Sequence, residues 1–170
     1  MILGMSTSAF TLLHVILSLI GIAAGLAVAA GMFGSKKLEG WTAVFLGATV
    51  FTSVTGYFFP RDQILPSHIV GALSLIALAI AILALYRFRL EGNWRWIYVV
   101  TALVALWFNV FVAIAQAFQK ISFLNALAPT QSDPPFVITQ FVVLAAFIAI
   151  GIAALKAFHP VANAQKLRPL

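Results

Sequence analysis

The sequence predicts an all-α fold: an integral membrane bundle of five transmembrane helices, with the N-terminus outside the cell and the C-terminus in the cytoplasm. Three observations predict it. Of the 170 residues, 63% are hydrophobic and 8% are charged, whereas soluble domains average about 45–50% apolar and about 25% charged residues. Five charge-free stretches approach the roughly 20 residues that a membrane-crossing helix needs. Lysine and arginine are concentrated in alternate connections between these stretches.

The breaks between the spans carry residues that end helices or prefer water. A Gly-Ser-Lys-Lys run follows the first span and a Pro-Arg-Asp-Gln run follows the second. Pro66 is expected in the first turn of the third span, where proline is tolerated. We therefore predict one domain over residues 1–170, with spans at roughly 9–34, 41–59, 67–86, 96–118 and 136–155.

The distribution of basic residues predicts the orientation. Of ten lysines and arginines, only Arg61 and Lys120 fall on the side of the N-terminus. The other eight fall in the first and third connections and in the tail. Because cytoplasmic segments carry the excess of basic residues, the N-terminus is expected outside. The net charge of +6 then reflects topology and attraction to the lipid bilayer, and no nucleic-acid surface is indicated.

Small and polar residues at helical spacing predict which faces turn inward, because membrane helices pack through small side chains and hydrogen bonds. Each of the five stripes brings a polar member toward the outer membrane surface. The stripes are His14, Ser18, Gly21, Gly25 and Ala29; Thr49, Ser53 and Gly56; His68, Ala72, Leu75 and Ala79; Ala102, Ala105, Asn109, Ala113, Gln116 and Lys120; and Gln140, Leu144, Phe147, Gly151 and Ala154.

A polar cluster is therefore expected at the periplasmic end of the bundle. His14 and His68 are predicted at matched depth on two helices, and Gln116 and Gln140 are predicted to reach the same level. These four residues are the candidate cofactor ligands. The secondary candidates are Asn109, Lys120, Arg61 and Asp62.

Two cofactors suit such a cluster. Two neutral imidazoles from separate helices can ligate a haem iron, so His14 and His68 are the candidate metal ligands of haem b. The same imidazoles, with the two glutamines, can instead bind a quinone headgroup. Asp62 with both histidines would suit a divalent metal. The aromatic residues predicted to wall a macrocycle are Trp107, Phe108, Phe111 and Phe118.

Simpler interpretations compete with a site. A histidine near the membrane interface often hydrogen-bonds only to a backbone carbonyl or to water, and buried amides often join helices. A non-catalytic accessory or assembly subunit of a larger membrane complex would need no cofactor. An oligomeric channel or small-solute carrier would use Asn109, Gln116 and Gln140 as a polar path. No hydrolase or nucleotide-binding motif occurs, so no catalytic residue is assigned.

Several strings give a resemblance that covers most of the chain. They are Leu-Pro-Ser-His-Ile-Val-Gly at 65–71, Trp-Arg-Trp-Ile-Tyr at 94–98, the stretch 109–120 and the loop 127–136. Together they resemble a group of small five-span bacterial inner-membrane proteins of unassigned function. The resemblance implies a multi-pass protein of the bacterial cytoplasmic membrane. It implies no activity, cofactor or partner.

Overall fold

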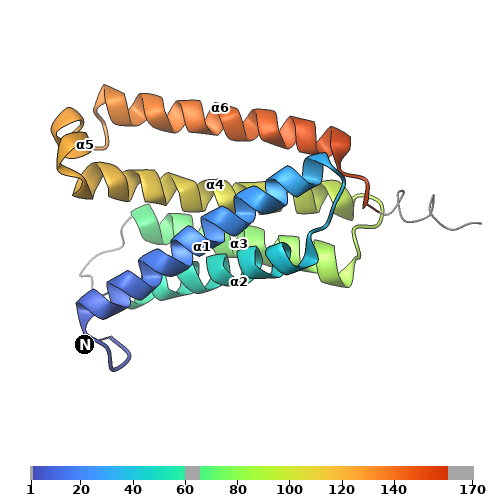
Figure 1. The fold of residues 1–170 in the computed structure, drawn as a ribbon, viewed down its shortest axis with the longest axis horizontal. Helices are drawn as coiled ribbons and strands as arrows, with labels where there is room; N and C mark the ends of the chain where they lie inside the picture. The colour runs from blue at the N-terminus through green and yellow to red at the C-terminus, as the bar shows by residue number, and fades with distance from the viewer. Residues whose placement is uncertain (1, 60–65, 161–170) are drawn as a thin grey trace, which may run out of the picture.

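The computed structural model of the chain describes residues 2–59 and 66–160, and these residues are almost entirely helical (Figure 1). Five helices among them are long and apolar enough to cross a membrane, and each overlaps one predicted span. Their α-helical parts are α1 (Thr7–Phe33), α2 (Glu39–Thr55), α3 (Pro66–Ile82), α4 (Trp94–Lys120) and α6 (Pro134–Ala157). The 3₁₀ turn η1 (Gly56–Phe58) continues α2, and the π turn η2 (Leu83–Arg87) continues α3. A short helix, α5 (Ser122–Leu127), precedes α6.

Local sequence explains several helix ends. Ser6 precedes α1, and its hydroxyl accepts a hydrogen bond from the backbone N–H of Ala9 at 3.2 Å. This N-cap satisfies one of the free N–H groups of the first turn. Pro134 and Pro135 occupy the first turn of α6, where no intrahelical N–H donor is needed. Helix α2 follows a left-handed residue, Leu38, with φ at 43°.

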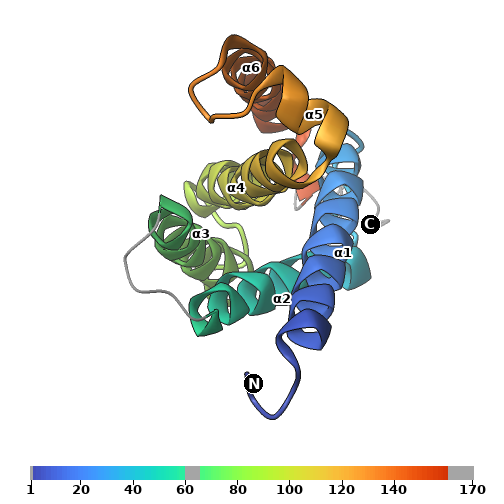
Figure 2. The same ribbon diagram turned by 90° about the vertical axis from the view of Figure 1, so that its left-hand side faces the viewer.

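Helix α4 is the centre of the bundle. It contacts α1, α2 and α3 on one side and α5 and α6 on the other. Figure 2, which looks along the bundle from the end where α1 begins, displays this arrangement. The main hydrophobic core lies toward the opposite end and is formed around Phe45, Leu78 and Leu106. A smaller cluster between α4, α5 and α6 includes Phe118 and Phe136.

Glycine allows α1 to approach its neighbours closely. A Cβ added to Gly25 would lie 2.5 Å from Leu106 Cδ1 on α4 and 2.9 Å from the ring of Phe45 on α2. Such distances are far below normal contact, so any larger residue here would force these side chains or α1 itself to shift. The predicted inward stripe of α1 is confirmed, since Gly21, Gly25 and Ala29 are all buried.

The predicted inward face of α3 is wrong. Ala72 and Ala79 are exposed, whereas Ser74, Leu78 and Ala81 are buried. Helix α3 carries small and apolar residues on every side, so spacing alone does not select the face that packs. The observed face is the one that meets α4 and α2.

Basic residues gather at one end of the bundle. The helices alternate in direction, so the α1–α2 connection, the α3–α4 connection and the end of α6 lie together (Figure 1). Lys120 ends α4 at the opposite end. The described basic residues of the first end are Lys36, Lys37, Arg87, Arg89, Arg95 and Lys156. The lysines and arginines of alternate connections thus lie together at one end of the bundle.

Candidate functional site

A cleft of about 620 Å³ opens between α1, α2, α3 and α4 toward the end of the bundle where α1 begins. We call it the four-helix cleft. Its volume lies within the roughly 300–1,000 Å³ of small-molecule sites. Most of its walls are apolar, and its polar lining includes His14, Ser18, His68, Asn109, Gln116 and Lys120. Five of the residues proposed from sequence therefore line a single cleft.

The imidazole of His14 is held by α2. Its Nδ1 lies 2.9 Å from Thr55 Oγ1. That hydroxyl has one proton, and it donates to the backbone carbonyl of Phe51 at 2.7 Å, with the carbonyl of Thr52 at 3.2 Å. The threonine oxygen therefore accepts from His14 Nδ1–H. In the neutral imidazole, Nε2 consequently carries the free lone pair, so it acts as an acceptor or a metal ligand.

Aromatic residues at the end of α2 pack against both histidines. The ring of Phe59 meets His14 edge-on, with centroids 5.3 Å apart. The ring of Tyr57 stacks on His68 at 5.4 Å, and its hydroxyl donates to the backbone carbonyl of His68 at 2.7 Å. Gly71 of α3 lies beside this tyrosine, and an added Cβ would be 3.4 Å from its Oη, an ordinary contact distance. Both imidazoles are therefore positioned by the same turns of α2 and η1.

Tyr57 and Phe59 are site residues that the sequence did not reveal. Their position at a span end indicated only the aromatic belt that membrane proteins place at the interface. In the structure both line the four-helix cleft. One signal was available: they directly follow the polar stripe of α2, which ends at Gly56.

The deep end of the cleft carries polar atoms without partners. Ser18 Oγ donates to Asn109 Oδ1 at 2.9 Å, which joins α1 to α4. Asn109 is only 7% exposed. Its Nδ2 finds no hydrogen-bond partner among the described residues, and the same is true of the hydroxyl of Thr52, which also lines the cleft. Buried polar atoms are rarely left unpaired in native proteins, so these two need an explanation.

The placement of Gln140 with the other candidates is wrong. This residue lies on α6, on the other side of α4, and its Nε2 donates to the backbone carbonyl of Phe111 at 3.1 Å. The stripe of α6 does face inward, but its neighbour is the back of α4. Helical spacing identifies an inward face without identifying the helix that it meets. Arg61 and Asp62 lie outside the described residues, so the metal site that used Asp62 does too.

The predicted aromatic wall is also largely displaced. Phe108 lines the four-helix cleft. Trp107 and Phe111 are not part of its lining, and Phe118 packs edge-on against Phe136 of α6 with centroids 5.5 Å apart. The described residues contain no group of three or more His, Asp or Glu side chains placed to hold a metal ion.

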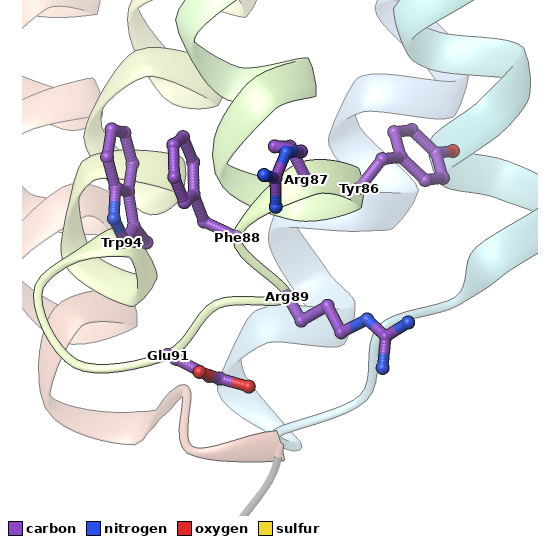
Figure 3. A pocket seen from close by; sticks show the side chains of 6 residues that line it. All are labelled: Tyr86, Arg87, Phe88, Arg89, Glu91 and Trp94. Atoms are coloured by element: carbon purple, nitrogen blue, oxygen red, sulfur yellow. The ribbon is translucent and has the colours of Figure 1, made fainter.

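A second hollow, of about 540 Å³, lies at the basic end of the bundle in the α3–α4 connection (Figure 3). Phe88 and Trp94 stack there at 3.8 Å with nearly parallel rings. The guanidinium of Arg87 lies 5.7 Å from the Phe88 ring centroid. Tyr86, Arg89 and Glu91 complete the lining and are exposed. Charges of both signs share this rim, so its chemistry selects no class of ligand.

Comparison with known proteins adds no assignment: no family model, curated protein or solved structure matches the chain.

Proposed function

We propose that the protein is a multi-pass protein of the bacterial inner membrane that binds a redox-type cofactor, a quinone, in the four-helix cleft. The cleft faces the periplasm in this proposal. The positions of the basic residues support this orientation. Six described basic residues lie at the end of the bundle away from the cleft, and the cytoplasmic ends of membrane proteins carry the excess of basic residues.

The observation that carries the proposal is the hydrogen bond from His14 to Thr55. It leaves Nε2 of His14 as an acceptor in a cleft whose other polar side chains include donors. A reduced quinone presents hydroxyl groups, which need an acceptor such as Nε2. An oxidised quinone presents carbonyl oxygens, which need donors such as Gln116 and Lys120. The cleft therefore offers partners to both oxidation states.

Haem b is the second candidate, and the same hydrogen bond favours it. Metal-bound histidines commonly donate their other ring N–H to an oxygen, which fixes the tautomer. A haem bound by two histidines needs the Nε2 atoms of both His14 and His68 directed at one iron. A quinone needs only one of them, and we therefore place the quinone first.

The experiment uses the intact protein purified in mild detergent from cells that contain both haem and quinone. Organic extraction under reducing conditions, followed by chromatography, should yield quinol in a fixed ratio to protein, and the His14→Ala variant, which lacks the Nε2 acceptor, should retain less of it. Gln140→Leu is the matched control, because this buried amide lies outside the cleft. A Soret band that shifts on dithionite reduction would instead establish haem. Absence of both cofactors would remove the proposal and favour an accessory subunit or a channel.

A further inference from the structure

Two amide side chains line the four-helix cleft from the same face of α4. Asn109, Ala113 and Gln116 follow one another at steps of four and three residues, and all three line the cleft. Seven residues of α-helix rise about 10 Å. The two amides are therefore two turns apart, with a small side chain between them.

The inner amide presents a donor with nothing to receive it. Ser18 occupies Oδ1 of Asn109, which leaves Nδ2 and its hydrogens free of any partner among the described residues. The hydroxyl of Thr52, which also lines the cleft, is buried and unpartnered in the same sense. Inside a membrane no bulk water satisfies such groups, so they are costly unless a ligand or bound water meets them. A ligand that places a hydrogen-bond acceptor at the deep end of the cleft would satisfy the Asn109 donor.

The space between the amides suits a flat ring. Ala113 contributes only a methyl group to the wall between them. If each amide donates along the helix axis from the level of its own backbone position, two hydrogen bonds of about 2.9 Å within a rise of about 10 Å leave roughly 5 Å between the ligand's two oxygens. Opposite positions of a six-membered ring give such a separation, whereas neighbouring positions do not.

We infer that the ligand class is the 1,4-quinones, with the ring lying over Ala113 and its two oxygens directed at Asn109 and Gln116. The inner oxygen accepts from Asn109 Nδ2–H, and the outer oxygen accepts from Gln116 Nε2–H. His14 faces this ring from α1 and supplies the acceptor for the reduced form. The inference rests on the proposed function and adds the ring type, its orientation and its two anchoring residues.

Binding measurements on the purified full chain test this assignment. The probes are a short-chain 1,4-benzoquinone and its 1,2-quinone isomer. Loss of one anchoring hydrogen bond in Asn109→Leu or Gln116→Leu should raise the dissociation constant about tenfold. Ala113→Leu should abolish binding by filling the ring's place, whereas Ala113→Gly should retain it. The 1,2-quinone should bind at least about tenfold more weakly than the 1,4-isomer, because it loses one hydrogen bond.

Matched controls separate these effects from general damage. Gln119→Leu removes an exposed amide of α4, and Ala149→Leu enlarges an exposed residue of α6. Both should bind the 1,4-quinone as the unaltered chain does. Infrared spectra of the 1,4-quinone, carbon-13 labelled at one carbonyl or the other and bound to the unaltered chain, supply a test that needs no variant. Both carbonyl stretches should move to lower frequency than in apolar solvent.

The outcomes distinguish this inference from the proposed function. If the unaltered chain binds the quinone and His14→Ala weakens binding of its reduced form, while Asn109→Leu and Ala113→Leu bind normally, the ring position is wrong and the function stands. A carbonyl stretch that stays at its frequency in apolar solvent overturns the two-anchor assignment as well. If the unaltered chain binds no quinone, both the proposed function and this inference fail.

Discussion

The hydroxyl of Thr55 lies 2.9 Å from His14 Nδ1 and 2.7 Å from the backbone carbonyl of Phe51. Its single proton goes to the carbonyl, and its oxygen receives the proton of Nδ1. One threonine on α2 therefore determines which nitrogen of a histidine on α1 is available in the cleft. If Nε2 is the atom that binds the ligand, Thr55 should control binding without touching the ligand.

Thr55→Val tests this control. Valine has nearly the shape of threonine but offers no oxygen to Nδ1–H, so His14 loses its fixed tautomer and orientation. Loss of one hydrogen bond should weaken binding of the reduced quinol about tenfold, as measured by titration of the purified protein under reducing conditions. Thr55→Ser keeps the hydroxyl and should bind as the unaltered chain does. Equal binding by the valine and serine variants would show that Thr55 does not position His14.

Gly25→Ala should destabilise the bundle. The added Cβ would lie 2.5 Å from Leu106 Cδ1 and 2.9 Å from the Phe45 ring, so α1 would have to move away. Overpacking of this kind costs about 1–3 kcal/mol, and the melting temperature in detergent should fall. Gly47→Ala is the control, because nothing lies within 4 Å of its added Cβ. It should leave the melting temperature unchanged or raise it, and equal losses in both variants would contradict the packing described.

Arg95→Ala should loosen the end of α6. The guanidinium donates to the backbone carbonyls of Leu155 at 3.1 Å and Phe158 at 2.7 Å, which tie α6 to the start of α4. Hydrogen bonds from charged groups contribute about 1.5–3 kcal/mol. Hydrogen exchange at residues 154–158 should accelerate in this variant and stay unchanged in Arg89→Ala, whose side chain is exposed. Unchanged exchange in Arg95→Ala would mean that these bonds do not hold the helix end.

Single cysteines test the proposed orientation, since the chain contains none. Ser132 in the α5–α6 connection and Glu91 in the α3–α4 connection are both exposed. In spheroplasts, which expose the periplasmic face, a membrane-impermeant maleimide should label Ser132→Cys. It should label Glu91→Cys only after the membrane is permeabilised. The reverse pattern would place the four-helix cleft on the cytoplasmic side.

Sequence patterns predicted the features that depend on one helix at a time. The five spans, the inward stripe of α1 and the shared face of Asn109 and Gln116 all follow from hydropathy and a 3.6-residue period. Each reflects the chemistry of a single segment in lipid.

The sequence patterns did not predict which helices contact one another, or the features that depend on those contacts. Gln140 faces inward, but α4 separates it from the cleft, and no periodic pattern records the order of helices around α4. The face of α3 was assigned wrongly because small residues occur all round that helix. Thr55 was visible only as a polar residue beside a stripe. Its role arises from a contact with His14, forty-one positions away.

Binding of a short-chain 1,4-benzoquinone to the unaltered chain, His14→Ala and Gln140→Leu measures the central claim most directly. We predict saturable binding by the unaltered chain and by Gln140→Leu. His14→Ala, which loses the Nε2 acceptor, should bind the reduced quinol about tenfold more weakly or worse. If His14→Ala binds the quinol as tightly as the unaltered chain, or if the unaltered chain binds neither form, the assignment of the four-helix cleft as a quinone site is contradicted.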